Sequence, residues 1–322
     1  QPIVLRGTDP ARLLADVNRA LAYVRRPRSI RLANNNDALT PAVVGTILGT
    51  AGPTLESLSL VFVFPSDADD DSDARLPPLF PAAECFPALP ALRTLVLSFN
   101  EAVTNADIES IAAKVPNLEQ LIVRNPGVRR TAIADSAIEA VAMHCPLLQH
   151  LDVSGTHGRV TSAAVAAVAR RCPRLTYLSV AETAGKVAGD AFRAVADNCA
   201  GLRHLDVSGN GAAVANEALT IIAGRCPQLR SIRASWAGVS EEAALFVARG
   251  CPELRFIDVS NSETPVTDAA IAAIAHSCPK LEYVDVARNQ GGITDAGVAA
   301  VAAHAPNLRH LILRETELQD VS

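Results

Sequence analysis

Two histidine–aspartate pairs are the residues of this 322-residue chain with the clearest potential for acid–base chemistry. His150 and Asp152, and again His204 and Asp206, stand two residues apart. In an extended strand, residues two apart project from the same side, so each pair would share one face. A histidine beside a carboxylate can serve as a general base, but it needs a nucleophile or a substrate pocket beside it. The sequence places no serine or cysteine nucleophile next to either pair, and it has no glycine-rich phosphate loop and no zinc-ligand spacing. We therefore expect a protein that is not an enzyme and needs no cofactor.

The seven cysteines could form disulfides, bind metal or act as nucleophiles. Six of them recur at intervals of 25 or 27 residues: Cys145, Cys172, Cys199, Cys226, Cys251 and Cys278. Equivalent segments have Leu89, Val115 or Ala305 in that place. A position that accepts these residues favours a small buried apolar group, so we expect free thiols and a reducing intracellular compartment, cytoplasmic or nuclear. Bridges between neighbouring coils are the alternative, since the strand spacing permits them.

An acidic run at residues 67–73, DADDDSD, resembles the start of a calcium-binding loop. Its spaced carboxylates match the first ligand positions of an EF-hand: Asp67, Asp69 and Asp71. The sixth position is Ser72 instead of glycine, and the twelfth is Pro78 instead of glutamate. We therefore expect no metal site here, but a solvated acidic loop within a proline-rich insertion over residues 62–88.

A repeated unit of about 27 residues must position all of these side chains. The segment Cys251–Ser277 contains one short apolar strand, a turn and one helix, and Cys278 starts the pattern again. Twelve such strands are predicted, and helices are expected to begin at serine or threonine N-caps: Thr104, Thr161, Ser240, Thr267 and Thr294. A fixed period of this length predicts a solenoid. We expect a single α/β domain over residues 1–322, with about 12 coils and with ends cut from a longer protein.

Composition and charge restrict the classes of partner. The net charge is −5 and the apolar share is 49%, of which few residues are aromatic. A general binder of nucleic acid or of anionic membranes would carry a basic excess, so neither partner is expected. No run of about 18 apolar residues and no signal peptide is visible in the sequence.

The repeat also carries a family resemblance. The pattern Cys-Pro-x-Leu-x-x-Leu-x-Val-Ser, followed by Val-Thr-Asp-x-x-Ile-x-x-Ile-Ala, has its best copies at Cys145, Cys251 and Cys278. Thr267-Asp268 and Thr294-Asp295 match the helix start. This pattern resembles the cysteine-containing leucine-rich repeat of F-box/LRR proteins. The resemblance implies a right-handed horseshoe with a parallel sheet on the concave face and helices on the convex side. In F-box/LRR proteins the repeats bind the substrate for ubiquitination and a separate F-box binds the ligase core, but residues 1–80 already read as repeats and show no F-box.

Two rows of outward-facing residues flank the buried leucines of the predicted strands. The first row is Gln120, His150, Tyr177, His204, Ser231, Phe256, Tyr283 and His310. The second row is Ile122, Asp152, Ser179, Asp206, Arg233, Asp258, Asp285 and Ile312. We expect a protein partner to bind this face, and the aspartates suit a basic segment of that partner. The expected contact residues are His150, Asp152, Tyr177, His204, Asp206, Arg233, Trp236, Phe256, Asp258, Tyr283, Asp285 and His310. Alternatively, the aspartates are simply tolerated on a solvated face and Trp236 fills a gap in its shortened coil.

Three functions fit these rows. The first is a protein-interaction module resembling a ubiquitin-ligase substrate receptor, with a ligase adaptor reached through a missing N-terminal element. The second is a structural scaffold subunit of a large assembly such as an axonemal complex, where the same repeats also occur. A third, a small-molecule co-receptor, would need a basic pocket on the concave face, and the aspartate row argues against one.

Overall fold

A computed structural model describes residues 3–6, 9–24, 26–34, 40–62, 87–98, 103–125, 133–262, 266–289 and 292–315. The chain divides into two compact units, Gln1–Val160 and Thr161–Ser322. The acidic run at 67–73, most of the predicted insertion 62–88 and the seventh cysteine, Cys85, lie outside the described residues.

Unit 1 alternates strands and helices in chain order. Its elements are β1 (Ile3–Leu5), α1 (Pro10–Tyr23), β2 (Ser29–Asn34), α2 (Pro41–Ala51), η1 (Gly52–Thr54), β3 (Ser57–Phe62), β4 (Thr94–Val96), α3 (Asn105–Ala112), β5 (Gln120–Ile122), α4 (Asp135–His144) and β6 (His150–Asp152). Each strand pairs in parallel with the next along the chain, from β1 to β6.

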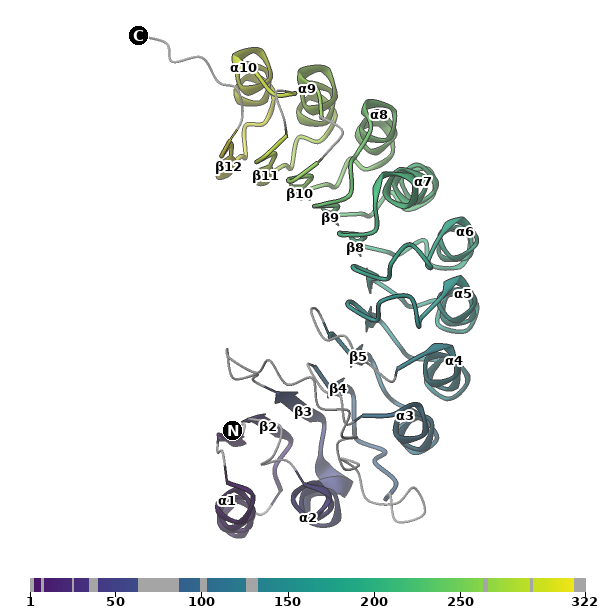
Figure 1. Cartoon of the computed structure of the whole chain (residues 1–322), viewed down its shortest axis with the longest axis vertical. Coiled ribbons are helices and arrows are strands. Elements are labelled where there is room, and N and C mark those ends of the chain that lie inside the picture. Colours follow the sequence, from purple (N-terminus) through teal and green to yellow (C-terminus); the bar gives the residue numbers. More distant parts are fainter. Residues whose placement is uncertain are drawn as a thin grey trace, which may run out of the picture. The chain divides into compact units, whose positions relative to one another are not determined.

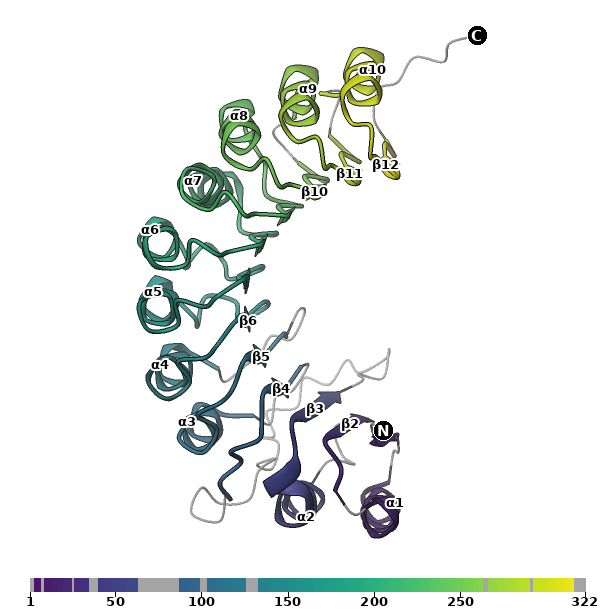
Figure 2. The same ribbon diagram turned by 180° about the vertical axis from the view of Figure 1, so that it is seen from behind.

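Unit 2 repeats the same alternation with a more uniform period. Its elements are α5 (Ser162–Arg171), β7 (Tyr177–Ser179), α6 (Gly189–Asn198), β8 (His204–Asp206), α7 (Ala212–Ala223), β9 (Ser231–Arg233), α8 (Glu241–Gly250), β10 (Phe256–Asp258), α9 (Asp268–Ser277), β11 (Tyr283–Asp285), α10 (Asp295–His304) and β12 (His310–Ile312). The strands again pair in parallel and in chain order. Within unit 2 the helices lie on one side and the strands on the other (Figures 1 and 2).

The central residue of each short strand forms the core beneath the sheet. Leu178, Leu205, Ile232, Ile257 and Val284 are all buried, whereas most of their neighbours on either side are half-buried or exposed. This alternation follows from the opposite orientation of successive side chains in a strand. All twelve predicted strands are therefore confirmed. Within unit 2, the first residue of each strand pairs with the first residue of the next.

Helix starts follow the predicted caps. Side-chain oxygens of Thr104, Thr161, Ser240, Thr267 and Thr294 each accept a hydrogen bond from a backbone N–H in the first turn. Thr294 is also tied to the previous coil, because its N–H and hydroxyl donate to Asp268 at 2.8 and 2.6 Å. These bonds fix the spacing between neighbouring helices as well as their ends.

The cysteine layer lies at the carboxyl ends of the helices. The six described cysteines are fully buried free thiols. The Cys278 thiol donates to the carbonyl of Cys251 at 3.4 Å, and the Cys199 thiol to the carbonyl of Ala169 at 3.6 Å. Burial raises the pKa of Cys251 and of Cys278 to about 12. The thiols therefore serve as small core groups, as predicted, and the disulfide alternative is not adopted.

Buried polar groups that follow several of the strands were missed from the sequence. The Asn289 amide donates to the carbonyls of Val286 and Val259 at 2.7 and 3.3 Å, and Thr183 and Ser262 donate to a carbonyl in their own turn. Where the amide reaches the preceding coil, it satisfies turn carbonyls that no strand partner can reach. Such residues read as ordinary turn residues in the sequence.

Candidate partner-binding face

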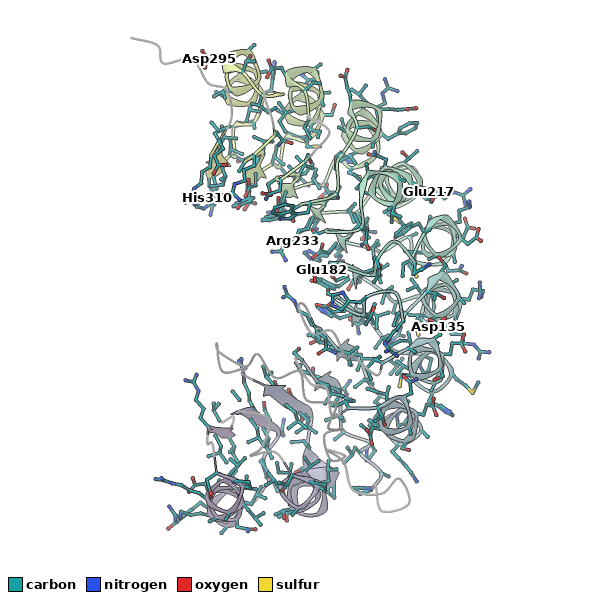
Figure 3. The ribbon with its side chains drawn as sticks, in the orientation of Figure 1. Asp135, Glu182, Glu217, Arg233, Asp295 and His310 are labelled. Atoms are coloured by element: carbon teal, nitrogen blue, oxygen red, sulfur yellow. The ribbon has the colours of Figure 1, made fainter. Side chains whose placement is uncertain are left out.

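The strand side of unit 2 brings the predicted aromatic and histidine residues into one row. The parallel register places Tyr177 beside His204, and Phe256 beside both Ser231 and Tyr283. Tyr283 in turn pairs with His310. Figure 3 shows His310 and Arg233 projecting from this side, whereas Glu217 projects from the side of α7.

The rings of this row contact one another. Phe256 and Tyr283 stack with centroids 4.4 Å apart and planes 9° apart. The Tyr283 and His310 centroids are 5.8 Å apart, and those of Tyr177 and His204 are 5.6 Å apart. Except for the exposed histidines, these side chains are half-buried, so each presents part of its ring to solvent while its neighbours hold its orientation.

A pocket of about 530 Å³ opens on this face around β8, β9 and β10. Its lining combines rings with charged groups: Tyr177, His204, Leu205, Asp206, Arg230, Ser231, Arg233, Arg255 and Phe256. Three arginines therefore face one aspartate. This corrects the expectation from the sequence that the aspartate row rules out a basic pocket on this face.

Each arginine of the pocket has a distinct environment. The guanidinium carbon of Arg233 lies 5.1 Å from the centroid of the Phe256 ring. Arg255 forms an ion pair with Glu282 at 2.7 Å. The Nε of Arg230 is buried and, among the described residues, has no hydrogen-bond partner. Arg230 and Arg255 were not among the contact residues predicted from the sequence. Each stands just before its strand, where arginine recurs in several coils.

The surroundings of two ring residues shift their protonation. The pKa of His204 lies below its ordinary value, first because of burial and then because of the positive charges of Arg230 and Arg233. Burial, with the hydrogen bond from the Tyr283 hydroxyl to Asp285 at 3.3 Å, raises the pKa of Tyr283. His204 is exposed at its edge but partly desolvated, and this desolvation together with the arginine charges favours its neutral form.

The aspartate row has a structural role that the sequence did not reveal. Each of its carboxylates accepts a hydrogen bond from the backbone N–H two residues later: Ser154 for Asp152, Ser208 for Asp206, Ser260 for Asp258 and Ala287 for Asp285, at 3.0 to 3.1 Å. The turn after each strand is thereby fixed by a short polar side chain. These aspartates therefore stabilise the turns of their own coils.

Two residues of that row are not available to a partner. Asp152 is only 6% exposed and its carboxylate also accepts the hydroxyl of Ser154, while Ser179 is 1% exposed. The prediction that Asp152 faces a partner is therefore wrong. Asp206, Asp258 and Asp285 are half-buried, so their exposure is smaller than the sequence suggested. His150, in unit 1, is also half-buried.

Trp236 occupies a special backbone position directly after β9. Its φ is +55°, and its N–H donates to the carbonyl of Ser260 at 3.0 Å. Glu182, Asn261 and Arg288 hold the same position in their coils, with φ between 54° and 55°. The Trp236 side chain is 64% exposed, so it does not fill a gap in the core. Its contact with a partner stays a prediction.

The described residues contain neither a metal-binding cluster nor a membrane-spanning helix. No group of three or more His, Cys, Asp or Glu side chains is placed to hold a metal ion in the part of the chain that is described. Across those same ranges, no helix has the length and apolar character needed to cross a membrane.

Comparison with known proteins agrees with the geometry of the repeat. A family described as Leucine Rich repeat matches residues 277–302. The chain has the leucine-rich-repeat fold. Among solved structures, Rad7 in the Rad7–Elc1 complex from yeast has a leucine-rich-repeat region similar to it, with a TM-score of 0.65 and 15% identity. That match covers 97% of this chain and 67% of the other.

A second solved structure is more distant. Internalin C2 from Listeria monocytogenes matches with a TM-score of 0.44 and 18% identity, over 68% of this chain and 78% of the other. The search of curated protein sequences finds no match. The likeness to Rad7 supports the leucine-rich-repeat fold alone, and function must be argued from the site.

Proposed function

We propose that this leucine-rich-repeat protein is a protein-interaction module that binds a partner on the strand face of unit 2. The observation that carries the proposal is the row of contacting, partly exposed rings formed by Phe256, Tyr283 and His310. Half-buried aromatic rings are held rigid before binding, so little conformational entropy is lost when a partner covers them. Aromatic and arginine side chains are also the residues that dominate binding energy at interfaces.

A non-enzymatic role is part of this proposal. The thiols of Cys199, Cys226, Cys251 and Cys278 have raised pKa values and are fully buried, so they are poor nucleophiles. The strand face offers rings and guanidinium groups that suit recognition better than bond cleavage.

Two phenylalanines on opposite sides of one repeat provide the test. Phe256 lies on the strand face, whereas Phe246 lies on α8 and is 38% exposed. Tagged wild type, Phe256→Ala and Phe246→Ala would be used to capture proteins from the source cells, with quantification by mass spectrometry. Partners bound by the wild type should fall about tenfold or more with Phe256→Ala, as expected for an anchor residue, and persist with Phe246→Ala. Thermal unfolding of both variants checks that the fold is kept.

The opposite pattern would favour the structural alternative. A scaffold subunit packed through its helices should lose its neighbours with Phe246→Ala and retain them with Phe256→Ala. It should also co-purify with one assembly at fixed stoichiometry, whereas a recognition module should exchange partners.

A finer form of the proposal is a substrate receptor of a ubiquitin ligase. It is supported by the repeat pattern at Cys251 and Cys278, which resembles that of F-box/LRR proteins, and by the fold shared with Rad7, which was solved in complex with Elc1. If this form is correct, the full-length protein co-purifies with a ligase adaptor equally well in wild type and in Phe256→Ala, because the adaptor would bind outside the strand face. Capture of the partner without any adaptor would reject the ligase role and leave the interaction module intact.

A further inference from the structure

The pocket on the strand face of unit 2 holds more positive than negative charge. Arg230, Arg233 and Arg255 line it together with Asp206. Glu282 offsets the charge of Arg255 through their ion pair. The remaining arginines of the lining outnumber the aspartate, so the pocket favours an anionic group over the basic segment expected from the sequence.

A further arginine adds to this surplus. Arg203 is exposed, and its charge acts on His204, which lines the pocket. Because His204 is held neutral, it neither adds to nor offsets the charge. Arg203, Arg230 and Arg233 exceed Asp206 and the neighbouring Asp258 by about one positive charge.

One hydrogen-bond donor of the pocket also lacks an acceptor. The buried Nε of Arg230 has no partner in the described part of the chain. A buried donor left unpaired costs free energy, which an acceptor on a ligand would recover. The Arg233 guanidinium packs against the Phe256 ring at 5.1 Å, and such stacking leaves the N–H groups at its edge able to donate to an anion.

We propose that this pocket binds a phosphorylated serine or threonine side chain of a protein partner. This inference rests on the proposed function and specifies what the partner presents. A phosphoryl group carries about 1.5 to 2 negative charges at pH 7 and three acceptor oxygens, which suit the positive charge and the arginine donors of the pocket. A carboxylate brings only one charge and two acceptor oxygens.

The surroundings of the pocket favour a protein over a nucleic acid. The register places Asp258 beside Arg233 and Asp285 beside Asp258, so carboxylates continue along the same row. A nucleic acid would bring further phosphates close to these carboxylates, whereas a modified peptide brings one. The stacked rings of Phe256 and Tyr283 offer apolar surface to the residues that flank the modified side chain.

The test uses the purified 322-residue chain and three degenerate peptide libraries that differ only at a fixed central residue: phosphoserine, serine or glutamate. The phosphoserine library should bind at least about tenfold more tightly than either of the others, because only phosphate supplies a second charge and a third acceptor. Arg233→Gln should abolish this preference. Arg249→Gln, on α8, is the matched control and should leave it unchanged.

Three outcomes would overturn the inference. They are no binding of the phosphoserine library, equal binding of the glutamate library, and tighter binding of a single-stranded RNA oligonucleotide that Arg233→Gln weakens. Treating the partners captured by the wild type with phosphatase separates this inference from the proposed function. If capture depends on Phe256 but survives both phosphatase and Arg233→Gln, the interaction module stands and the phosphate inference fails. If capture does not depend on Phe256, the proposed function fails.

Discussion

Alkaline pH is expected to destabilise unit 2 through its buried thiols. Burial raises the pKa of Cys251 from the ordinary value of 9.0 to about 12, and the same cause raises the pKa of Cys226 to about 11. A raised pKa means that the folded state keeps a proton that the unfolded state releases. The contribution to stability is therefore complete below pH 9 and is lost as the pH rises from 9 toward the folded value.

The size of the effect follows from the width of that interval. Each proton held only by the folded state lowers the free energy of unfolding by about 1.36 kcal/mol per pH unit. Between about pH 8 and 11, the Cys251 thiol alone should remove about 2.5 kcal/mol, since its ionisation in the unfolded state begins near 9. Cys199 and Cys278, whose pKa values are also raised to about 12, should act in the same direction.

A single substitution isolates the Cys251 thiol. Cys251→Ala should be less stable than the wild type at pH 8 because it leaves a small cavity, but it should lose about 2.5 kcal/mol less between pH 8 and 11. Urea unfolding followed by circular dichroism at each pH measures both quantities. Tyrosines and lysines titrate alike in the two proteins, so they cancel in the difference. Parallel loss of stability in the two proteins would refute the assignment of the thiols as buried groups with raised pKa.

Five further substitutions test the packing and the turns. Leu205→Asp should prevent unit 2 from folding, because Leu205 is 1% exposed and an unpaired charge would be buried; a cooperative far-ultraviolet melt like that of the wild type would contradict this. Asp258→Ala should cost about 1 kcal/mol by removing the acceptor of the Ser260 N–H, and Asp258→Asn should restore most of it in the same urea titration. Gly250→Ala should destabilise the protein clearly, since an added Cβ would overlap a backbone carbonyl of the preceding helix. Gly45→Ala, where an added Cβ has nothing within 4 Å, should stabilise the protein by about 1 kcal/mol. Equal shifts of the melting temperature in the two variants would refute this account of the helix packing.

The repeat itself was predictable because its signals are local. A leucine flanked by outward residues specifies a strand, and a threonine before an alanine-rich stripe specifies a helix start, so Leu205 and Thr267 could be assigned without coordinates. The core role of Cys251 followed in the same way, by comparison with Val115 and Ala305 in equivalent coils.

The candidate site was predictable only in part. The sequence placed Phe256, Tyr283 and His310 in one row, because register follows from a constant repeat length. The sequence could not show that the Asp258 carboxylate accepts a hydrogen bond within its own turn. An aspartate with this role occupies the same position of the repeat as one that contacts a partner. The burial of Asp152 was missed for the same reason.

What the sequence determined by itself is the period, the identity of the buried positions and the order of the strands, because these depend on patterns within one coil. What only the tertiary structure decided is which polar groups remain for a partner. Arg230, Arg233 and Arg255 come from different coils, and their convergence with the Phe256 ring on one pocket depends on how side chains from three strands fill the space between them. The charge that a surface offers to a partner depends on which side chains converge there and on the hydrogen bonds that they already make. The spacing of a repeat predicts neither of these.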